Sequence, residues 1–427
     1  MKKRTLIGLL AVLPLALLGA CGGNSGNDAT VRLVNASPGY TSLDLYVDDS
    51  KVASSVTFGA VSDSASAKNG TVTTALTAAD STTDLLTQSR SLSSGKKYAV
   101  VAYGWEGALK SVVMSEDETE ADSDKTNVSV LNTSVDAGSL DVYLTGENDD
   151  LVSATPVRTA VAGGSRSSFS AVTSGTYRLR VTGTGDYTDL RLDVSNVTIS
   201  SKGVVTFIIT PTTGGVLVNS LMFTQGGAMA QQLGTKARAR VMAAVDGGAA
   251  VTLYADTFRL ANASKSPAIQ SYTLINAGLV TVNTSIDGNS LGSQQVNVAV
   301  GADLTLLVSG TSAGTATMTP ITDDNRLPTV STKYKIRLLH ASPLLAADAL
   351  TLSVDLSDVI GNQGYPAASA YETITANSSS DISVTDFSAN TTFGELTDQA
   401  MVGNSVYTMF VYDTSAGVTT AKLLKER

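Results

Sequence analysis

The sequence has 427 residues, of which 16% are charged, with a formal net charge of −9 at pH 7. One hydrophobic core rarely organises more than roughly 250–300 residues, so several domains are expected. The negative charge excludes a basic face for nucleic acid and disfavours adhesion to anionic lipid by charge alone. A single cysteine and a single histidine exclude an internal disulfide and a thiolate zinc site, and no cofactor is expected.

The first predicted element is an export signal over residues 1–20. Its apolar run at residues 6–17 is too short to span a hydrocarbon core of ~30 Å but suits a signal peptide. Leu18-Gly19-Ala20-Cys21 then resembles the lipobox of bacterial lipoproteins. The resemblance implies that Cys21 is lipidated, that cleavage precedes it, and that the lipid holds the protein to a membrane. The alternative is an ordinary secretory signal with a chance cysteine.

Residues 21–30 are predicted to be the lipidated cysteine and a flexible, Gly- and Asn-rich tether. Gly22 stands where an aspartate would retain a Gram-negative lipoprotein at the inner membrane, so the resemblance favours the outer membrane. The net charge becomes −12 once Lys2, Lys3 and Arg4 are removed. The expected location is the cell envelope, facing either the periplasm or the cell surface.

An internal repeat fills the rest of the chain. Residues 31–47 (VRLVNASPGYTSLDLYV) align without a gap with residues 128–144 at an offset of 97, and further copies begin at 239 and 336. A spacing near 100 residues is the size of one sandwich domain. The repeat predicts four domains, at residues 31–118, 125–225, 236–324 and 333–427.

The pattern inside each repeat is that of β-strands. Leu43, Leu45 and Val47 alternate with Asp44 and Tyr46, and turn signals recur about every 8–12 residues. The expected fold class is all-β, with tandem immunoglobulin-like antiparallel β-sandwich domains behind an N-terminal lipoprotein signal peptide. Four such domains end to end would reach roughly 100–120 Å, although the pattern also permits them to fold back on one another.

Trp105, the only tryptophan, lies in the predicted hairpin tip Tyr103-Gly104-Trp105-Glu106-Gly107. An exposed indole could stack on a sugar ring or a protein partner, which makes Trp105 a candidate ligand-binding residue. The other interpretation, which we favour, is that the indole covers the open end of its own sandwich.

An acidic run separates the first two repeats. Calcium takes 6–8 oxygen ligands, so these carboxylates are weak candidates for a calcium site between domains. The run lacks the spacing of an EF-hand loop, and a solvated linker whose charges repel one another is favoured. The run consists of Glu116, Asp117, Glu118, Glu120, Asp122 and Asp124.

No catalytic residue is expected. His340 aligns with Asn35 and Asn132 of earlier repeats, and nothing nearby suggests the nucleophile and orienting acid that a catalytic base needs. We predict that it is a polar residue closing a strand end. The Ala-Ser-Pro elements at 36–38 and 341–343 are likewise interpreted as turn chemistry.

The RLVNASP element, the following LDLYVDD and a closing hairpin together resemble a bacterial family catalogued as domain of unknown function 4397. Residues 31–38 with 43–49 carry the best match, and residues 336–343 the second. The family's domains occur in tandem on exported proteins and have no established activity. The resemblance therefore implies a fold and no catalytic residues.

The sequence thus favours a non-catalytic cell-envelope lipoprotein that presents tandem sandwiches for binding or adhesion, with a glycan or an envelope protein as partner. A periplasmic scaffold or assembly lipoprotein with a protein partner is the first alternative. A glycan-active enzyme is the second, and it is disfavoured because no pair of positioned carboxylates is legible.

Overall fold

The computed structural model describes residues 28–311 and 314–427. The signal peptide, Cys21 and nearly all of the predicted tether lie outside these residues. The described chain consists of strands with four short 3₁₀ turns, which confirms the all-β fold class. None of its helices could cross a membrane.

Sandwich 1 pairs a sheet of strand order β4-β1-β7-β8 with one of order β3-β2-β5-β6. Its strands are β1 (Ala29–Asn35), β2 (Ser42–Val47), β3 (Ser50–Thr57), β4 (Ala65–Ala67), β5 (Gly70–Ala78), β6 (Asp84–Leu92), β7 (Lys97–Tyr103) and β8 (Lys110–Ser115).

Sandwich 2 pairs β12-β9-β15-β16-β17 with β11-β10-β13-β14. Its elements are β9 (Lys125–Asn132), η1 (Val135–Ala137), β10 (Leu140–Thr145), η2 (Leu151–Ser153), β11 (Arg158–Val161), β12 (Ser170–Thr173), β13 (Gly175–Gly183), β14 (Asp186–Ile199), β15 (Gly203–Pro211), β16 (Val218–Thr224) and β17 (Met229–Gln232).

Sandwich 3 pairs β21-β18-β25-β26, in which β22 also pairs with β18, with β20-β19-β23-β24. Its elements are β18 (Lys236–Val245), η3 (Asp246–Gly248), β19 (Ala250–Ala255), β20 (Phe258–Lys265), β21 (Ala268–Ile269), β22 (Thr273–Asn276), β23 (Gly278–Ile286), β24 (Asn289–Val298), β25 (Asp303–Gly310) and β26 (Thr317–Asp323).

Sandwich 4 pairs β30-β27-β34-β35, in which β31 also pairs with β27, with β29-β28-β32-β33. Its elements are β27 (Lys333–His340), η4 (Pro343–Leu345), β28 (Leu350–Val354), β29 (Ser357–Gln363), β30 (Ala367–Ala368), β31 (Glu372–Thr375), β32 (Asn377–Asp386), β33 (Thr391–Met401), β34 (Ser405–Asp413) and β35 (Thr419–Lys425).

One strand pair in each sandwich is parallel. The opening strand pairs in parallel with a strand near the end of the same sandwich, as β1 with β7, β9 with β15, β18 with β25 and β27 with β34. The other strand pairs are antiparallel, as the sequence predicts. The parallel pair brings the beginning and the end of each repeat together in one sheet.

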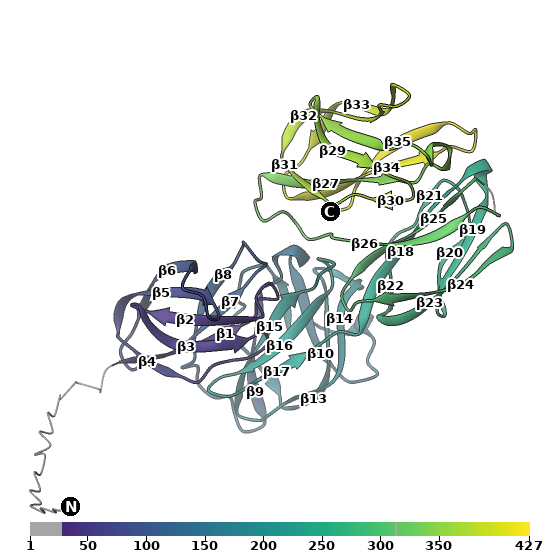
Figure 1. Ribbon diagram of the computed structural model, residues 1–427. Coiled ribbons are helices and arrows are strands. Elements are labelled where there is room, and N and C mark those ends of the chain that lie inside the picture. Colours follow the sequence, from purple (N-terminus) through teal and green to yellow (C-terminus); the bar gives the residue numbers. More distant parts are fainter. Residues whose placement is uncertain (1–27, 312–313) are drawn as a thin grey trace, which may run out of the picture.

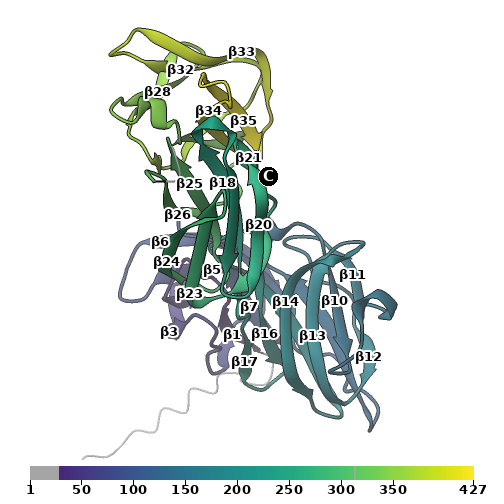
Figure 2. The ribbon, with the colours of Figure 1, turned by 90° about the vertical axis from the view of Figure 1, so that its right-hand side faces the viewer.

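The sandwiches pack as two pairs, side by side (Figures 1 and 2). In β1, Leu33 points into the core of sandwich 1 whereas Val34 joins a second apolar cluster with Leu131 and Ile208 of sandwich 2. A matching cluster joins sandwiches 3 and 4 and includes Leu339 and Phe410. Strands buried on both faces become continuous apolar runs, which explains sequences such as IRLLH. Within each pair the sandwiches therefore fold back on one another, which is one of the two arrangements that the sequence permits.

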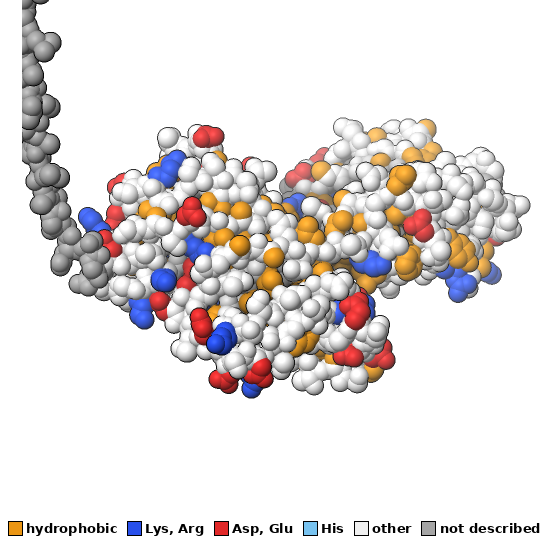
Figure 3. Space-filling view, turned by 90° about the horizontal axis from the view of Figure 1, so that it is seen from below, with side chains coloured by type: hydrophobic (Ala, Val, Ile, Leu, Met, Phe, Trp, Pro, Cys, Tyr) orange, Lys and Arg blue, Asp and Glu red, His pale blue; other side chains and the backbone are white. Residues whose placement is uncertain are grey.

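The exterior carries few charges, as the composition implies. On the face shown in Figure 3, apolar side chains run along the middle of the molecule and charged ones are scattered around them. The apolar side chains of the strands are nevertheless largely buried, in six clusters. Four of these clusters lie inside sandwiches and two lie between sandwiches.

Replacing Leu339 by alanine tests the packing of sandwich 3 on sandwich 4. Leu339 is fully buried between the two sandwiches, so Leu339→Ala should lower the free energy of unfolding by about 2–5 kcal/mol in urea denaturation. Leu356, which is 97% exposed, provides the matched control, and Leu356→Ala should change little. Equal effects of the two variants would mean that the sandwiches do not pack through this face.

Candidate functional site at the junction of the sandwiches

An arginine of the repeat marks each interface. Arg240 and Arg337 occupy the same repeat position in sandwiches 3 and 4, and each reaches an acidic side chain at the end of the other sandwich. Arg240 donates to both carboxylate oxygens of Glu426 at 2.7 and 2.6 Å, and Arg337 donates to Asp323 at 2.5 Å. The side chains of both pairs are at most 6% exposed, so two reciprocal, buried ion pairs fix how the sandwiches face each other.

Aromatic rings complete these ion pairs. The guanidinium carbon of Arg240 lies 4.5 Å from the ring centre of Tyr272, and that of Arg337 lies 4.9 Å from the ring centre of Tyr371. Burial by itself would lower the pKa of Arg240, but the hydrogen bond and charge of Glu426 outweigh it and raise that pKa. Arg240 therefore stays charged throughout the physiological pH range.

The interface of sandwiches 1 and 2 has only one such arginine. Arg32 donates from Nε to Glu116 at 2.7 Å, lies 4.7 Å from the ring centre of Phe223, and donates to the carbonyl of Gly227 at 2.7 Å. Ser129 stands at the corresponding position of sandwich 2 and hydrogen-bonds to Thr206 instead. Arg32 thus pairs with an acidic residue at the end of its own sandwich and reaches sandwich 2 through Phe223 and Gly227, so the first pair has one interface arginine where the second pair has two.

The acidic run does not gather into a metal site. Glu116 is 6% exposed and bound to Arg32, whereas Asp117 accepts the backbone N–H of Lys97 at 2.9 Å. Glu120, Asp122 and Asp124 are exposed and Glu118 takes part through its backbone. Within residues 28–311 and 314–427, no three His, Cys, Asp or Glu side chains are grouped as metal ligands. The described part of the chain therefore offers no group of carboxylates that supports the calcium hypothesis.

Asp136, in η1 of sandwich 2, connects three distant segments. One carboxylate oxygen accepts the indole N–H of Trp105 at 2.8 Å, and the other accepts the backbone N–H of Leu327 at 2.9 Å. Its carbonyl oxygen accepts a hydrogen bond from the guanidinium of Arg427. Sandwiches 1, 2 and 4 and the segment between sandwiches 3 and 4 therefore meet at one residue that is 7% exposed.

Trp105 lies at this junction, half-buried, and its contacts reach beyond its own sandwich. The guanidinium carbon of Arg326 is 4.5 Å from the centre of the indole, and Arg326 is in turn held by Asp324 at 2.7 Å. Burial would raise the pKa of Asp324, but Arg326 and Lys335 together lower it. The indole is thus fixed by groups from sandwich 2 and from the segment between sandwiches 3 and 4.

Sandwiches 2 and 3 approach each other backbone to backbone. The N–H of Gly214 donates to the carbonyl of Gly301 at 3.0 Å, and the Thr212 hydroxyl donates to the same carbonyl at 2.9 Å. Gly215 has a φ of +85°, and a Cβ there would lie 2.6 Å from the backbone nitrogen of Arg326. A side chain at this glycine would force the two halves of the molecule apart.

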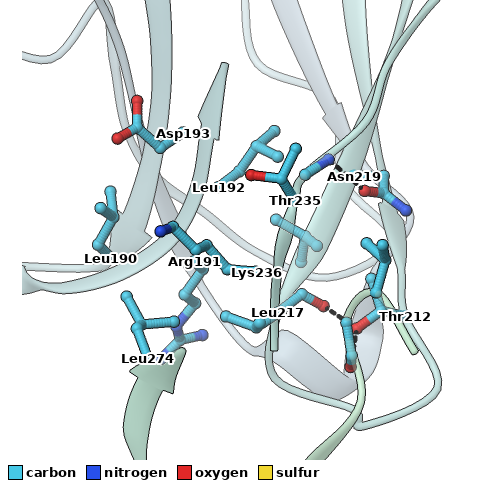
Figure 4. A pocket seen from close by; sticks show the side chains of 14 residues that line it. Leu190, Arg191, Leu192, Asp193, Thr212, Leu217, Asn219, Thr235, Lys236 and Leu274 are labelled. Carbon is cyan, nitrogen blue, oxygen red and sulfur yellow. Dashed lines mark hydrogen bonds between the residues drawn. The ribbon is translucent and has the colours of Figure 1, made fainter. Parts of the chain in front are cut away.

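Of the hollows at the junction, two matter for the question of ligand binding. The first, between sandwiches 2 and 3, is lined by Leu190, Leu192, Leu217 and Leu274 among others (Figure 4), and its volume of about 40 Å³ suits water molecules rather than a ligand. The second, which we name the Trp105 cavity, has a volume of about 220 Å³. Its walls include Tyr103, Trp105, Lys110, Pro211, Ser331 and Asn404.

His340 is the last residue of β27 and is fully buried. Its Nε2 lies 3.2 Å from the carbonyl oxygen of Leu345, Nδ1 has no partner among the described residues, and burial lowers its pKa. Asn35 at the same repeat position donates to two carbonyls and accepts the N–H of Ser37. The histidine thus holds the turn as the asparagines do, with one side-chain hydrogen bond where each asparagine makes three.

Truncation of Arg337 tests the reciprocal ion pairs. Arg337→Ala leaves Asp323 buried without its counter-charge and should cost about 3–5 kcal/mol of unfolding free energy. Arg178→Ala, at an ion pair whose side chains are 30% and 22% exposed, should cost no more than about 1 kcal/mol and serves as the control. Calorimetry or urea unfolding measures both, and similar costs for the two variants would contradict the importance assigned to the buried pair.

The histidine predicts a pH dependence. Because the pKa of folded His340 lies below its ordinary value of 6.5, the unfolded chain binds more protons, and stability should fall as the pH drops below about 6.5. His340→Asn restores the side chain of the other repeats and should remove this slope, as melting temperatures between pH 5 and 7.5 would show. An unchanged slope in the variant would mean that other groups cause it.

Comparison with known proteins adds a family. No curated protein matches the sequence. Two solved structures are weakly similar: the fimbrial anchor protein Mfa2 from Porphyromonas gingivalis (11% identity, 47% of this chain and 98% of that one, TM-score 0.21) and the Bacillus anthracis TIE protein (8% identity, 90% and 68%, TM-score 0.15). These scores are too low to support an argument.

A family model described as "Domain of unknown function (DUF4397)" matches residues 29–143 and 237–347, each stretch a sandwich plus the start of the next. Since the two stretches cover more than half of the chain, the protein belongs to this family.

Proposed function

We propose that the protein is a non-catalytic lipoprotein of the cell envelope that displays two sandwich pairs for binding or adhesion. The observation that carries the proposal is the junction at Asp136, where segments 191 and 291 residues away along the chain are hydrogen-bonded to one residue. Together with the buried interfaces inside each pair, this junction makes the four sandwiches a stiff body. A stiff body presents a binding surface without the entropic cost of ordering it on contact.

Attachment to the membrane is proposed from the sequence. Cys21, outside the described residues, stands in the lipobox-like segment, and Ala29 already begins β1. An anchor of several acyl chains would hold the body at the membrane stably, and Gly22 favours the outer membrane. The exposed body would then face either the cell surface or the periplasm.

The chemistry of the Trp105 cavity supports a binding role over an enzymatic one. Glycoside hydrolysis uses two carboxyl groups on either side of the scissile bond. Asp136 supplies the only carboxylate among the residues that line this cavity, and both of its oxygens already accept hydrogen bonds. A periplasmic scaffold with a protein partner remains the second candidate, because the same stiff body suits assembly.

Fractionation tests the anchor. The wild-type protein should be found in the membrane fraction and partition into detergent, whereas Cys21→Ser should be exported and soluble. Identical fractionation of the two proteins would rule out a lipid on Cys21.

Protease treatment of intact cells distinguishes surface display from the periplasmic scaffold. Degradation without lysis, while a periplasmic marker protein stays intact, is expected for surface display. Protection that ends when the outer membrane is opened would support the scaffold. Purified protein treated in parallel must be degraded, since a tightly packed β-protein can resist protease by itself.

A further inference from the structure

The Trp105 cavity contains polar groups that the protein itself does not use. Tyr103, Lys110, Ser331 and Asn404 line it, and none makes a side-chain hydrogen bond or ion pair within the described residues. Tyr103 as a whole is only 7% exposed and packs in the apolar cluster between sandwiches 1 and 2. These groups come from sandwich 1, sandwich 4 and the segment that precedes sandwich 4, so only the assembled body brings them together.

Two charged side chains line the cavity, Lys110 and Asp136. Both carboxylate oxygens of Asp136 already accept hydrogen bonds, whereas Lys110 forms no ion pair among the described residues. Near the indole, Arg326 and Lys335 share the single carboxylate of Asp324. An anionic group would be attracted to this point of the surface, and Lys110 is the cation left free to bind it.

The indole supplies a flat, fixed platform. Asp136 holds its N–H and Arg326 lies over its ring, so its orientation is set before any ligand arrives. The apolar face of a sugar ring packs well against such a surface while its hydroxyl groups face polar side chains. The volume of about 220 Å³ is below the roughly 300–1,000 Å³ of pockets for drug-sized ligands, so it suits one ring of a longer chain.

We propose that the Trp105 cavity binds one acidic sugar unit of a glycan, with the ring against Trp105 and the carboxylate on Lys110. Tyr103, Ser331 and Asn404 hydrogen-bond to the ring hydroxyls. The proposal rests on the proposed binding function and names its ligand class.

The single tryptophan of the chain makes the test direct. Detergent-solubilised full-length protein is titrated with tetragalacturonic acid and with a hyaluronan tetrasaccharide, and the emission of Trp105 is followed. A saturable change is expected with at least one uronic acid oligosaccharide, and neutral maltotetraose should bind at least about tenfold more weakly. No saturable response to either acidic oligosaccharide would overturn the proposal, as would equal binding of maltotetraose or of an oligoglutamate peptide.

Three variants locate the interaction. Lys110→Met should weaken binding of the acidic oligosaccharide about tenfold and leave maltotetraose unaffected. Asn404→Gly, which removes the amide and suits the left-handed backbone at this position (φ +55°), should weaken both. Lys68→Met, at an exposed lysine of the same sandwich away from the cavity, should change neither. All three should melt as the wild type does, and unchanged affinity in Lys110→Met would overturn the proposal.

The outcomes are separable from those of the proposed function. If the purified protein binds the sugar but the protein in cells is soluble and unanchored, the proposed sugar site stands and the proposed membrane display is wrong. If the protein is anchored and accessible to protease but binds no sugar, the membrane display stands and the sugar site is wrong.

Discussion

The arrangement of the whole molecule depends on the outer faces of the sheets that contain the parallel strand pairs. In an isolated sandwich, Val34, Leu131, Leu339 and Phe410 would lie on the surface; here they are fully buried between sandwiches. Burial of such side chains contributes about 1.5–3 kcal/mol each, so this apolar contact, and not the ion pairs beside it, accounts for most of the association energy. The structural unit is therefore a pair of sandwiches, each built from one repeat.

The buried ion pairs decide which pairing is formed. A buried pair gains little net stability over an apolar replacement, because desolvation of both charges offsets their attraction. A sandwich that slid along its partner would, however, separate Arg337 from Asp323 and Arg240 from Glu426, leaving four buried charges unmatched. The apolar faces supply the attraction and the arginines fix the register. In the first pair, where Ser129 replaces the second arginine, Arg32 does so together with hydrogen bonds that join residues 116 and 118 to residues 225 and 226.

Local sequence patterns predicted the sheets. The junction at Asp136 could not be predicted, because the residues that form it lie far apart along the chain. The alternation in residues 43–47 and the repeated turns identify strands directly, since each depends on neighbouring residues alone. The apolar run in IRLLH carried a signal for burial on both faces, but one run does not say which partner covers it. Asp136, Arg326 and Arg427 are ordinary surface residues by their local sequence, and only the fold joins Asp136 and Arg326 to Trp105 and Arg427 to Asp136. Cys21 was identified by its motif and lies outside the described chain.

The position of the parallel strand pair has a mechanical consequence. The chain enters sandwich 1 at Ala29 and runs directly into β1, whose Thr30–Asn35 lie opposite Lys97–Ala102 of β7 in parallel register. Tension applied at Ala29 along the strand acts across all of these backbone hydrogen bonds simultaneously, in shear, instead of opening them one after another. If the molecule is held by its N-terminal end while the other sandwiches are pulled, the hydrogen bonds between β1 and β7 would resist the mechanical unfolding of sandwich 1.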